Sequence, residues 1–261
     1  TILDEVSTRS NYLFSGSQKW ELMKGLSESL AGMVSILELG TLSLREINNV
    51  SFNTPFIPTL DYFKERENCI KKYNNLWKVI HRGGYPELYE DDPRDWEEYY
   101  SSYVKTYIER DVYDITKIRD NNLFYRFMVS VAARTGNMLD YSSISKDIGV
   151  SLETIKTPKV YFRDTGLAAY LTSWLTPETL ENGAMNGAFF ETFVINEIIK
   201  SYINQGKDYK KRIYYYRGKD KVKKTQNGID TFEENEIDLI IEENGILYPK
   251  KKKKTTNPKS E

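Results

Sequence analysis

The chain has 261 residues, of which 37 are Lys or Arg and 38 are Asp or Glu, giving a formal net charge of −1. This balance excludes a global electrostatic footprint for nucleic acid or an anionic membrane. One cysteine, Cys69, excludes an internal disulfide, and one Cys with one His argues against a structural zinc site. No run has the length of a membrane helix and no signal peptide is visible, so we expect a cytoplasmic protein without a membrane partner.

Residues 1–47 have the pattern of an α/β nucleotide-binding core. TILDEV places Asp4 and Glu5 after apolar residues, and YLFSGS is a short apolar strand that ends in small polar residues, among them Ser15. In P-loop ATPases a buried strand delivers such an acidic pair to the nucleotide, the Asp for Mg²⁺ and the Glu for the attacking water. A hydroxyl at Ser15 could orient that water. The segment therefore predicts part of an ATPase core.

Each of these features also has a plainer interpretation. An acidic pair after a strand is common, and SGS can be a turn in which Ser17 caps the next helix. The phosphate-binding pattern G-x-x-x-x-G-K-[ST] occurs nowhere in the sequence. The chain as it stands therefore cannot cradle a triphosphate.

Residues 48–180 are expected to be mainly helical, because apolar residues recur at helical spacing. The recurring residues are Trp77, Ile80, Tyr99, Tyr103, Tyr107, Phe124, Phe127, Met128 and Val131. The glycines of GGYP predict a turn with positive φ, and the proline fixes its exit. Arg110, in YIERDV, belongs to a charged trio that is either a solvated helix face or a contact to nucleotide or to a neighbouring subunit.

The stretch SSISKDIGVSLETIK predicts a helix-turn-helix. Its first helix ends at Gly149, and Ser151 caps a second helix. That second helix would direct Ser151, Thr154 and Lys156 toward DNA phosphates or base edges. Glu153 would repel phosphate, and such modules in large ATPases also contact protein, so both kinds of partner stay open.

Residues 181–261 change to one helix followed by strands, with the helix at FFETFV and the strands at IYYY, EIDLII and ILYP. This order is similar to the PD-(D/E)xK nuclease core, in which carboxylates hold Mg²⁺ and a lysine aligns the water. The likeness makes Glu191 the helix glutamate, Asp238 the metal aspartate and Lys253 the lysine. The metal-binding glutamate falls on Lys251, whose ammonium would repel Mg²⁺, so we expect this nuclease-like site to be inactive.

In their order along the chain, these stretches resemble an AAA+ ATPase family of bacteria and archaea whose members end in a restriction-endonuclease-like domain. The matching stretches are YLFSGS to LREI, GGYPELY, YYSSYVKTYIERDV, FMVSVAARTGNMLDYSSISKDIGVS, TPKVYFRDTGLAAYLTSW, GAFFETFVINEIIKSY, EIDLII and LYP to KTTNP. The joins before YLFSGS and after Lys156 are shorter than in the family. We interpret both as omitted segments; the alternative is a degenerate or truncated gene. Met33 replaces an arginine that is usual in the family.

The resemblance implies an α/β plus α protein with four regions. These are a partial P-loop ATPase core (1–47), a helical lid (48–120), a winged-helix-like module (121–180) and a PD-(D/E)xK-like α/β domain (181–261). The resemblance further implies ATP and Mg²⁺ as cofactors, with Asp4 on the metal and Arg110 near the nucleotide. The resemblance leaves two macromolecular partners undecided, namely DNA and further copies of the chain in a homo-oligomer.

We therefore expect an ATPase that couples nucleotide hydrolysis to conformational work, with DNA as a candidate target and an inactive nuclease-like domain. Two alternatives stay open. One is a DNA-binding or Mg²⁺-dependent nuclease with a regulatory ATPase part, which a carboxylate at position 251 would favour. The other is a noncatalytic protein-interaction module, which a neutral or acidic surface around 142–156 and 200–224 would favour.

Overall fold

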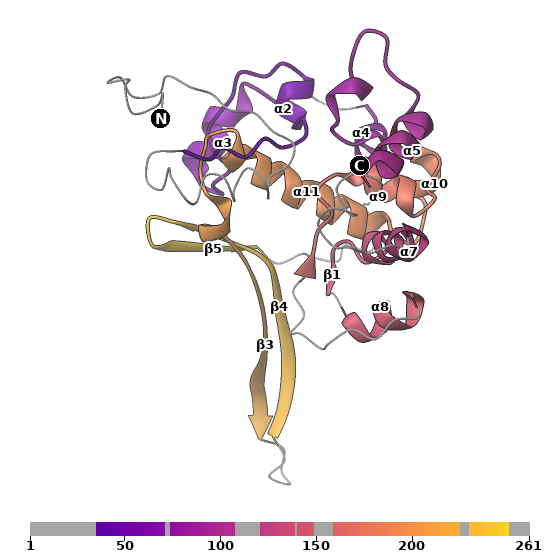
Figure 1. Ribbon diagram of the computed structural model, residues 1–261. Helices are drawn as coiled ribbons and strands as arrows, with labels where there is room; N and C mark the ends of the chain where they lie inside the picture. Colours follow the sequence, from indigo (N-terminus) through magenta and orange to yellow (C-terminus); the bar gives the residue numbers. More distant parts are fainter. Residues whose placement is uncertain are drawn as a thin grey trace, which may run out of the picture. The chain divides into compact units, whose positions relative to one another are not determined.

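The computed structural model (Figure 1) describes residues 35–70, 74–107, 121–138, 140–148, 159–224 and 230–250. The chain divides into two compact units, Thr1–Leu37 and Glu38–Glu261, and almost all described residues belong to the second. The expected ATPase residues Asp4, Glu5 and Ser15 lie outside the described residues. The same holds for the following residues with expected roles: Arg110, Ser151, Thr154, Lys156, Lys251 and Lys253.

The described part of the chain combines helices with small antiparallel sheets, which confirms a mixed α/β class. Its α-helices are α2 (Leu44–Ile47), α3 (Leu60–Glu67), α4 (Leu76–Arg82), α5 (Trp96–Tyr107), α7 (Asn121–Ala132), α8 (Tyr141–Ile148), α9 (Thr165–Leu171), α10 (Pro177–Glu181) and α11 (Asn186–Ile203). Two short 3₁₀ helices are η2 (Pro86–Leu88) and η4 (Tyr209–Lys211). None of the described helices is both long and apolar enough to cross a membrane.

The strands among the described residues form two sheets. A two-stranded sheet joins β1 (Asn137–Met138) to β2 (Lys159–Val160), and a three-stranded sheet has the order β3 (Ile213–Lys224), β4 (Asp230–Glu243) and β5 (Ile246–Lys250). Both sheets are antiparallel. Asn244 and Gly245 connect β4 to β5 with φ values of 53° and 77°. Such a two-residue turn with positive φ matches the right-handed twist of the strands that it joins.

The helices expected from apolar spacing are confirmed for the described residues of 48–180. Every residue that predicted them lies in α4, α5 or α7. The region also contains β1 and β2, which the sequence did not predict because two-residue strands carry too few positions to show alternation. The first helix of the expected helix-turn-helix, α8, ends at Ile148, one residue before Gly149. Its second helix falls outside the described residues.

Helix α11 connects the helical part of the unit to the three-stranded sheet. In its second half, Ile195, Ile199 and Tyr202 pack with Leu239 and Ile241 of β4 in one core cluster. In its first half, two phenylalanines join a second cluster with residues of α4, α9 and α10: Ile80, Ala168, Ala169, Leu180, Phe189 and Phe193. Burying each large apolar side chain contributes about 1.5–3 kcal/mol. Through these two clusters, α11 packs against both the helices and the three-stranded sheet, and it lies near the centre of the view in Figure 1.

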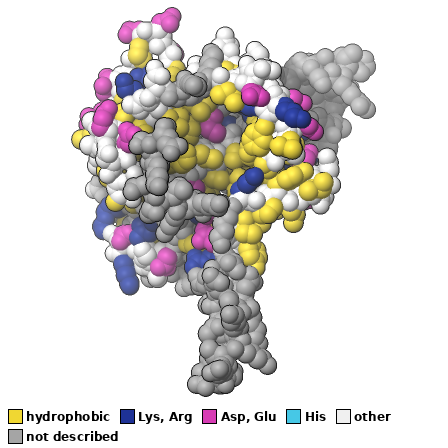
Figure 2. All heavy atoms as spheres, turned by 180° about the vertical axis from the view of Figure 1, so that it is seen from behind, with side chains coloured by type: hydrophobic (Ala, Val, Ile, Leu, Met, Phe, Trp, Pro, Cys, Tyr) yellow, Lys and Arg dark blue, Asp and Glu magenta, His cyan; other side chains and the backbone are white. Residues whose placement is uncertain are grey.

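The register of the three-stranded sheet decides which of its faces is buried. Ile213, Ile241 and Tyr248 are paired across the strands, and all three belong to the core cluster on α11. Successive side chains of a strand point to opposite faces, so the neighbouring row faces away from α11. That row contains Tyr214, which is 41% exposed. Figure 2, which shows the molecule from behind relative to Figure 1, has hydrophobic side chains over a broad area of its surface.

The turn at GGYP and helix α9 are held together by one buried carboxylate. Asp164 caps the N-terminus of α9 by accepting a hydrogen bond from Leu167 N at 2.8 Å. It also accepts hydrogen bonds from Gly84 N at 2.7 Å and from the Tyr100 hydroxyl at 2.8 Å. Gly83 has φ = 81°, as the turn predicted, and a Cβ there would lie 2.5 Å from the Asp164 carboxylate. This position therefore requires glycine for its backbone conformation and for space.

The single histidine of the chain gives stability a pH dependence. His81 is buried on α4, where its ring stacks on Trp96 and its Nε2 lies 2.8 Å from the Trp174 carbonyl oxygen. Burial lowers the pKa of His81, and the hydrogen bond to Trp174 opposes this only in part. The unfolded chain binds a proton near pH 6.5, whereas the folded chain resists it. Stability contributed by neutral His81 is therefore lost as pH falls below that value.

We expect the free energy of unfolding to fall by on the order of 1 kcal/mol between pH 7 and pH 5.5. Urea unfolding of the wild type and of His81→Gln at both pH values measures this difference. The variant, whose amide can still donate to Trp174 but does not titrate, should lose less stability over that range. An equal loss in both proteins would show that other groups carry the pH dependence. The charged neighbours of His81 are Glu178 and Arg82, which both proteins keep.

Candidate functional site

The candidate site is built around Lys159, the first residue of β2. Lys159 pairs with Met138 of β1, and this pairing brings its side chain beside α11 and β4. Only 5% of the side chain is exposed. A lysine that is so deeply buried is stable only if its ammonium is paired and hydrogen-bonded.

Three carboxylates surround the ammonium of Lys159. Its Nζ lies 2.7 Å from Glu191 Oε1 of α11, 2.9 Å from Asp238 Oδ1 and 3.1 Å from Glu236 Oε1, both of β4. An ammonium has three hydrogen-bond donors, so these three oxygens use all of them. Glu236 and Asp238 reach the same lysine because residues two apart in a strand share one face. We call Lys159, Glu191, Glu236 and Asp238 the lysine cluster.

Two tyrosines complete the surroundings of the lysine cluster. The Tyr161 hydroxyl donates to Glu191 Oε1 at 2.8 Å, and the Lys159 ammonium lies 5.7 Å from the Tyr161 ring centroid. The Tyr215 ring lies 5.3 Å from the same ammonium, and its hydroxyl contacts the Met138 sulfur at 3.6 Å. The register between β3 and β4 shifts next to Tyr215, where two steps from Tyr214 to Tyr216 oppose three steps on β4, and such bulges are common beside functional sites.

The charges of the lysine cluster keep the lysine protonated. Burial alone would lower the pKa of Lys159, but the hydrogen bonds to Glu191 and Asp238 more than offset it and raise that pKa above its ordinary value. Burial, together with the negative charge of Glu191, also raises the pKa of Tyr161. Neither group can therefore accept a proton near neutral pH. The site can hold charges in place, but it offers no general base from these two side chains.

The lysine cluster contains two of the residues that the nuclease-like pattern selected. Glu191 and Asp238 are 47 positions apart in sequence and both contact Lys159. The pattern missed Lys159, Tyr161 and Glu236. A signal for Glu236 was available in EIDLII, where two acidic residues alternate with apolar ones on a strand. The role of Lys253 stays a prediction outside the described residues.

The ammonium at the centre of the lysine cluster competes with a metal ion for the three carboxylates. No group of three or more His, Cys, Asp or Glu side chains within the described ranges is arranged to hold one. In the lysine cluster, the ammonium pairs with one oxygen of each carboxylate, and its positive charge would repel a hard cation such as Mg²⁺ at the same atoms. The cluster in this form therefore joins β2, α11 and β4 by ion pairs.

The lysine cluster is continuous with the helix-turn-helix segment. Helix α8 lies between β1 and β2 in sequence, and its buried Ile144 packs against Val160 of β2 as well as against α7. Arg134 and Asp147, paired by a hydrogen bond of 2.6 Å, fix α8 to the end of α7. The chain that follows the helix-turn-helix segment therefore continues into β2, whose first residue, Lys159, contacts α11 and β4.

Comparison with known proteins gives two family matches, neither of which covers half of the chain. Residues 73–157 match a model described as "Domain of unknown function (DUF8612)". Residues 186–261, which include Glu191 and Asp238, match "Domain of unknown function (DUF4143)". No solved structure is significantly similar to the chain.

Two mycobacterial relatives align along nearly the whole chain. Each is an uncharacterized protein, one from Mycobacterium bovis and one from Mycobacterium tuberculosis, and each is 22% identical over 289 residues. The alignment covers 98% of this chain and 55% of each relative, so the chain spans about half the length of these relatives. Because 289 exceeds the 261 residues of the chain, the relatives carry additional residues at internal positions.

Proposed function

We propose that the chain is part of an AAA+ ATPase that couples ATP hydrolysis to conformational work on DNA. In this proposal the C-terminal α/β part does not cleave DNA but acts as a coupling element. The order of the stretches that resemble the AAA+ family supports the ATPase part. The single observation that supports the coupling role is the lysine cluster, in which an ammonium occupies the centre of three carboxylates.

The proposed roles follow the chain. Asp4 and Glu5 would serve Mg²⁺ and the attacking water, with Ser15 beside them and Arg110 near the nucleotide. Ser151, Thr154 and Lys156 would contact DNA. A change in the position of the helix-turn-helix segment would then pass through β2 to α11, because Lys159 ties these elements together. Coupling over such a distance requires a packed element that has two discrete arrangements, and both sites must favour one arrangement over the other.

The test uses the full-length protein, with ATP hydrolysis measured in the presence and absence of duplex DNA, and with supercoiled plasmid to detect strand cleavage. We expect DNA to stimulate hydrolysis, and we expect no cleavage with Mg²⁺. Glu236→Gln removes one charge from the most exposed member of the lysine cluster, whose side chain is 42% exposed. This variant should lower the stimulation by DNA and leave basal hydrolysis unchanged. Equal stimulation in both proteins would contradict the coupling role.

One observation favours a second function, a Mg²⁺-dependent nuclease. Glu191 and Asp238 approach the same lysine, as the nuclease-like pattern requires of its carboxylates and lysine. In that case Lys159 would take the place of Lys253 as the group that aligns water. Plasmid cleavage that requires Mg²⁺ and disappears in Asp238→Asn would establish this function and remove the noncatalytic one.

A further inference from the structure

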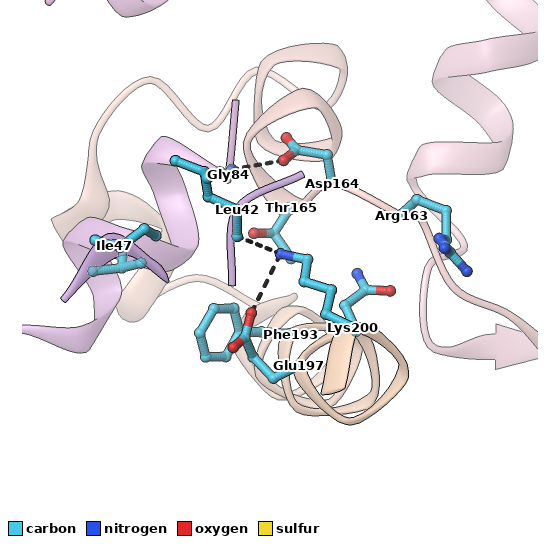
Figure 3. Close-up of a pocket in the computed structure, with 12 residues that line it drawn as sticks. Leu42, Ile47, Gly84, Arg163, Asp164, Thr165, Phe193, Glu197 and Lys200 are labelled. Carbon is cyan, nitrogen blue, oxygen red and sulfur yellow. Dashed lines mark hydrogen bonds and ion pairs between the residues drawn. The ribbon is translucent and has the colours of Figure 1, made fainter. Parts of the chain in front are cut away.

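One cavity beside α11 is closed by contacts within the chain. Its free volume is about 10 Å³, which is no more than the space that one water molecule needs. Lys200, which lines it, donates to the Leu42 carbonyl oxygen at 2.8 Å and to Glu197 Oε1 at 3.3 Å, as Figure 3 shows. This cavity therefore has no room for a ligand. The three-stranded sheet, by contrast, presents an open face on the side away from α11.

The outer face of the sheet, which we define as the side away from α11, exposes two tyrosines of β3. Tyr214 is 41% exposed and Tyr216 is 44% exposed. Residues two apart in a strand point to the same face and lie about 7 Å apart, so both rings stand on this side. Tyr215, between them, points to the other side, where its ring lies 5.3 Å from the Lys159 ammonium. The tyrosine-rich stretch of β3 thus places rings on both faces of the sheet.

Both outer rings are held in place before any ligand binds. The Tyr214 hydroxyl donates to the Lys211 carbonyl oxygen at 2.6 Å. The Tyr216 ring extends along the strand over Gly218, because a Cβ on that glycine would lie 2.1 Å from the Tyr216 hydroxyl oxygen and 2.6 Å from its Cζ. A glycine inside a strand often marks a position that another group approaches closely. Side chains that are already fixed lose little conformational entropy on binding, which favours affinity.

The chain around these tyrosines is strongly basic, although the whole protein is not. Residues 207–224 contain nine Lys or Arg and two Asp, a net charge of +7, whereas the whole chain has a net charge of −1. Lys210 and Lys211, which precede Tyr214, are exposed. The Lys211 side chain is 84% exposed, and its contact to Asp208 is long, at 4.0 Å. Aromatic rings that stack bases, next to basic residues that follow the phosphates, are the combination that binds single-stranded nucleic acid.

Several acidic residues of β4 are neutralised within the fold. Two of them belong to the lysine cluster, and Glu243 pairs with Arg212 at 2.5 Å. Glu242 shares the outer face with Tyr214, because it lies two residues from the β4 residue that pairs with this tyrosine. Loss of solvation, followed by the charge of Glu242, raises the pKa of Tyr214. The Glu242 carboxylate therefore lies near the Tyr214 hydroxyl, where it opposes a phosphate.

We propose that the outer face of the three-stranded sheet binds single-stranded DNA. One base stacks on the Tyr214 ring and the next base stacks on the Tyr216 ring, while Lys210 and Lys211 contact the phosphates. A duplex keeps the faces of its bases inside the helix, so this surface selects a single strand. The choice of DNA over RNA rests on the proposed function, whereas the stacking needs neither ATP nor the helix-turn-helix segment. No covalent bond is made or broken.

The test measures binding of a fluorescein-labelled oligothymidylate of about twelve nucleotides to the full-length protein by fluorescence anisotropy, without ATP. Tyr214→Leu and Tyr216→Leu should each weaken binding about tenfold, because one base loses its aromatic partner. Tyr216→Phe retains the ring and should bind as tightly as the wild type. Tyr125→Leu is the control, because Tyr125 of α7 is also exposed, at 38%, and its loss should not change the affinity.

Three charge variants test the contact with phosphates. Lys211→Gln should lower the slope of the logarithm of the affinity against that of the salt concentration by about 0.7, as expected for one phosphate of a single strand. Lys78→Gln removes an exposed lysine of α4 and should leave this slope unchanged. Glu242→Gln should tighten binding by up to roughly fivefold, because a carboxylate no longer opposes the phosphates.

The same proteins are titrated with a duplex and with an oligouridylate, and thermal melts confirm that each variant remains folded. Weaker binding of the single strand in both leucine variants, with unchanged duplex binding, supports the proposal. Absence of saturable oligothymidylate binding, equal losses in Tyr216→Leu and Tyr216→Phe, or tighter binding of the oligouridylate would overturn it. Duplex binding without single-strand binding would also overturn it, while the proposed function would still stand.

Discussion

Lys159→Met is expected to lower the free energy of unfolding by about 3–5 kcal/mol, because removing one partner of a buried ion pair leaves the other charges uncompensated. Methionine has a similar volume, so packing changes little and the loss measures charge. Without the ammonium, Glu191, Glu236 and Asp238 repel one another at the junction of β2, α11 and β4. Urea unfolding at neutral pH, analysed by linear extrapolation, measures the loss.

Lys207→Met is the matched control, because Lys207 is an exposed lysine that follows α11. That control should change stability by no more than about 0.5 kcal/mol. The double variant Lys159→Met with Glu191→Gln removes one of the repelling charges. Its loss should therefore be smaller than the sum of the two single losses, since residues in direct contact are not additive. A loss below about 1 kcal/mol for Lys159→Met would show that the carboxylates are already hydrated and that the lysine cluster does not stabilise the fold.

Some elements of the fold were predictable from local pattern. The residues of EIDLII and ILYP favour strands and are separated by turn residues, and these two stretches lie in β4 and β5. FFETFV lies in α11. β3 runs from Ile213 to Lys224, well beyond the tyrosine-rich stretch that predicted it. Its second half is rich in lysine and has one β-branched residue, Val222, so its local preference for a strand is weak; pairing with β4 outweighs that preference.

The candidate site was only half predictable. The pattern found Glu191 and Asp238 because each belongs to an element with a recognisable position in the order. It did not find Lys159, because the contacts of this lysine join residues 32 and 79 positions away in sequence. Nothing in TPKVYF indicates that its lysine is buried; lysine is one of the residue types most often exposed. Such a contact follows from tertiary packing, and the apolar spacing of single elements carries no information about it.

The same limit applies to Asp164, whose carboxylate joins stretches that lie far apart in the sequence. GGYP predicted a turn and TPKVYFRDTG predicted no role for its aspartate. In the structure, the carboxylate of Asp164 receives the Gly84 amide from one stretch and the Tyr100 hydroxyl from another. Burial, followed by the charge of Asp164, raises the pKa of Tyr100, so this hydroxyl stays a donor. The aspartate is therefore the point at which α4, α5 and α9 are fixed relative to one another.

Asp164→Ala is expected to lower the free energy of unfolding by about 4 kcal/mol, because it leaves buried donors on Gly84, Tyr100 and Leu167 without an acceptor. Urea unfolding measures the global loss. Hydrogen exchange adds a local readout: the amides of Gly84 and Leu167 should lose protection more than the amides of the three-stranded sheet, because the carboxylate protects those two directly.

Asp208→Ala is the matched control, since Asp208 caps the 3₁₀ helix η4 by accepting from Lys210 N but lies on the surface. The loss of an exposed cap costs about 1 kcal/mol, and water can satisfy the freed amide. The difference between the two substitutions therefore isolates the effect of burial and of the additional donors. Losses of equal size in Asp164→Ala and Asp208→Ala would mean that Asp164 is only a helix cap. The turn at GGYP would then be held by packing of its tyrosine and not by this carboxylate.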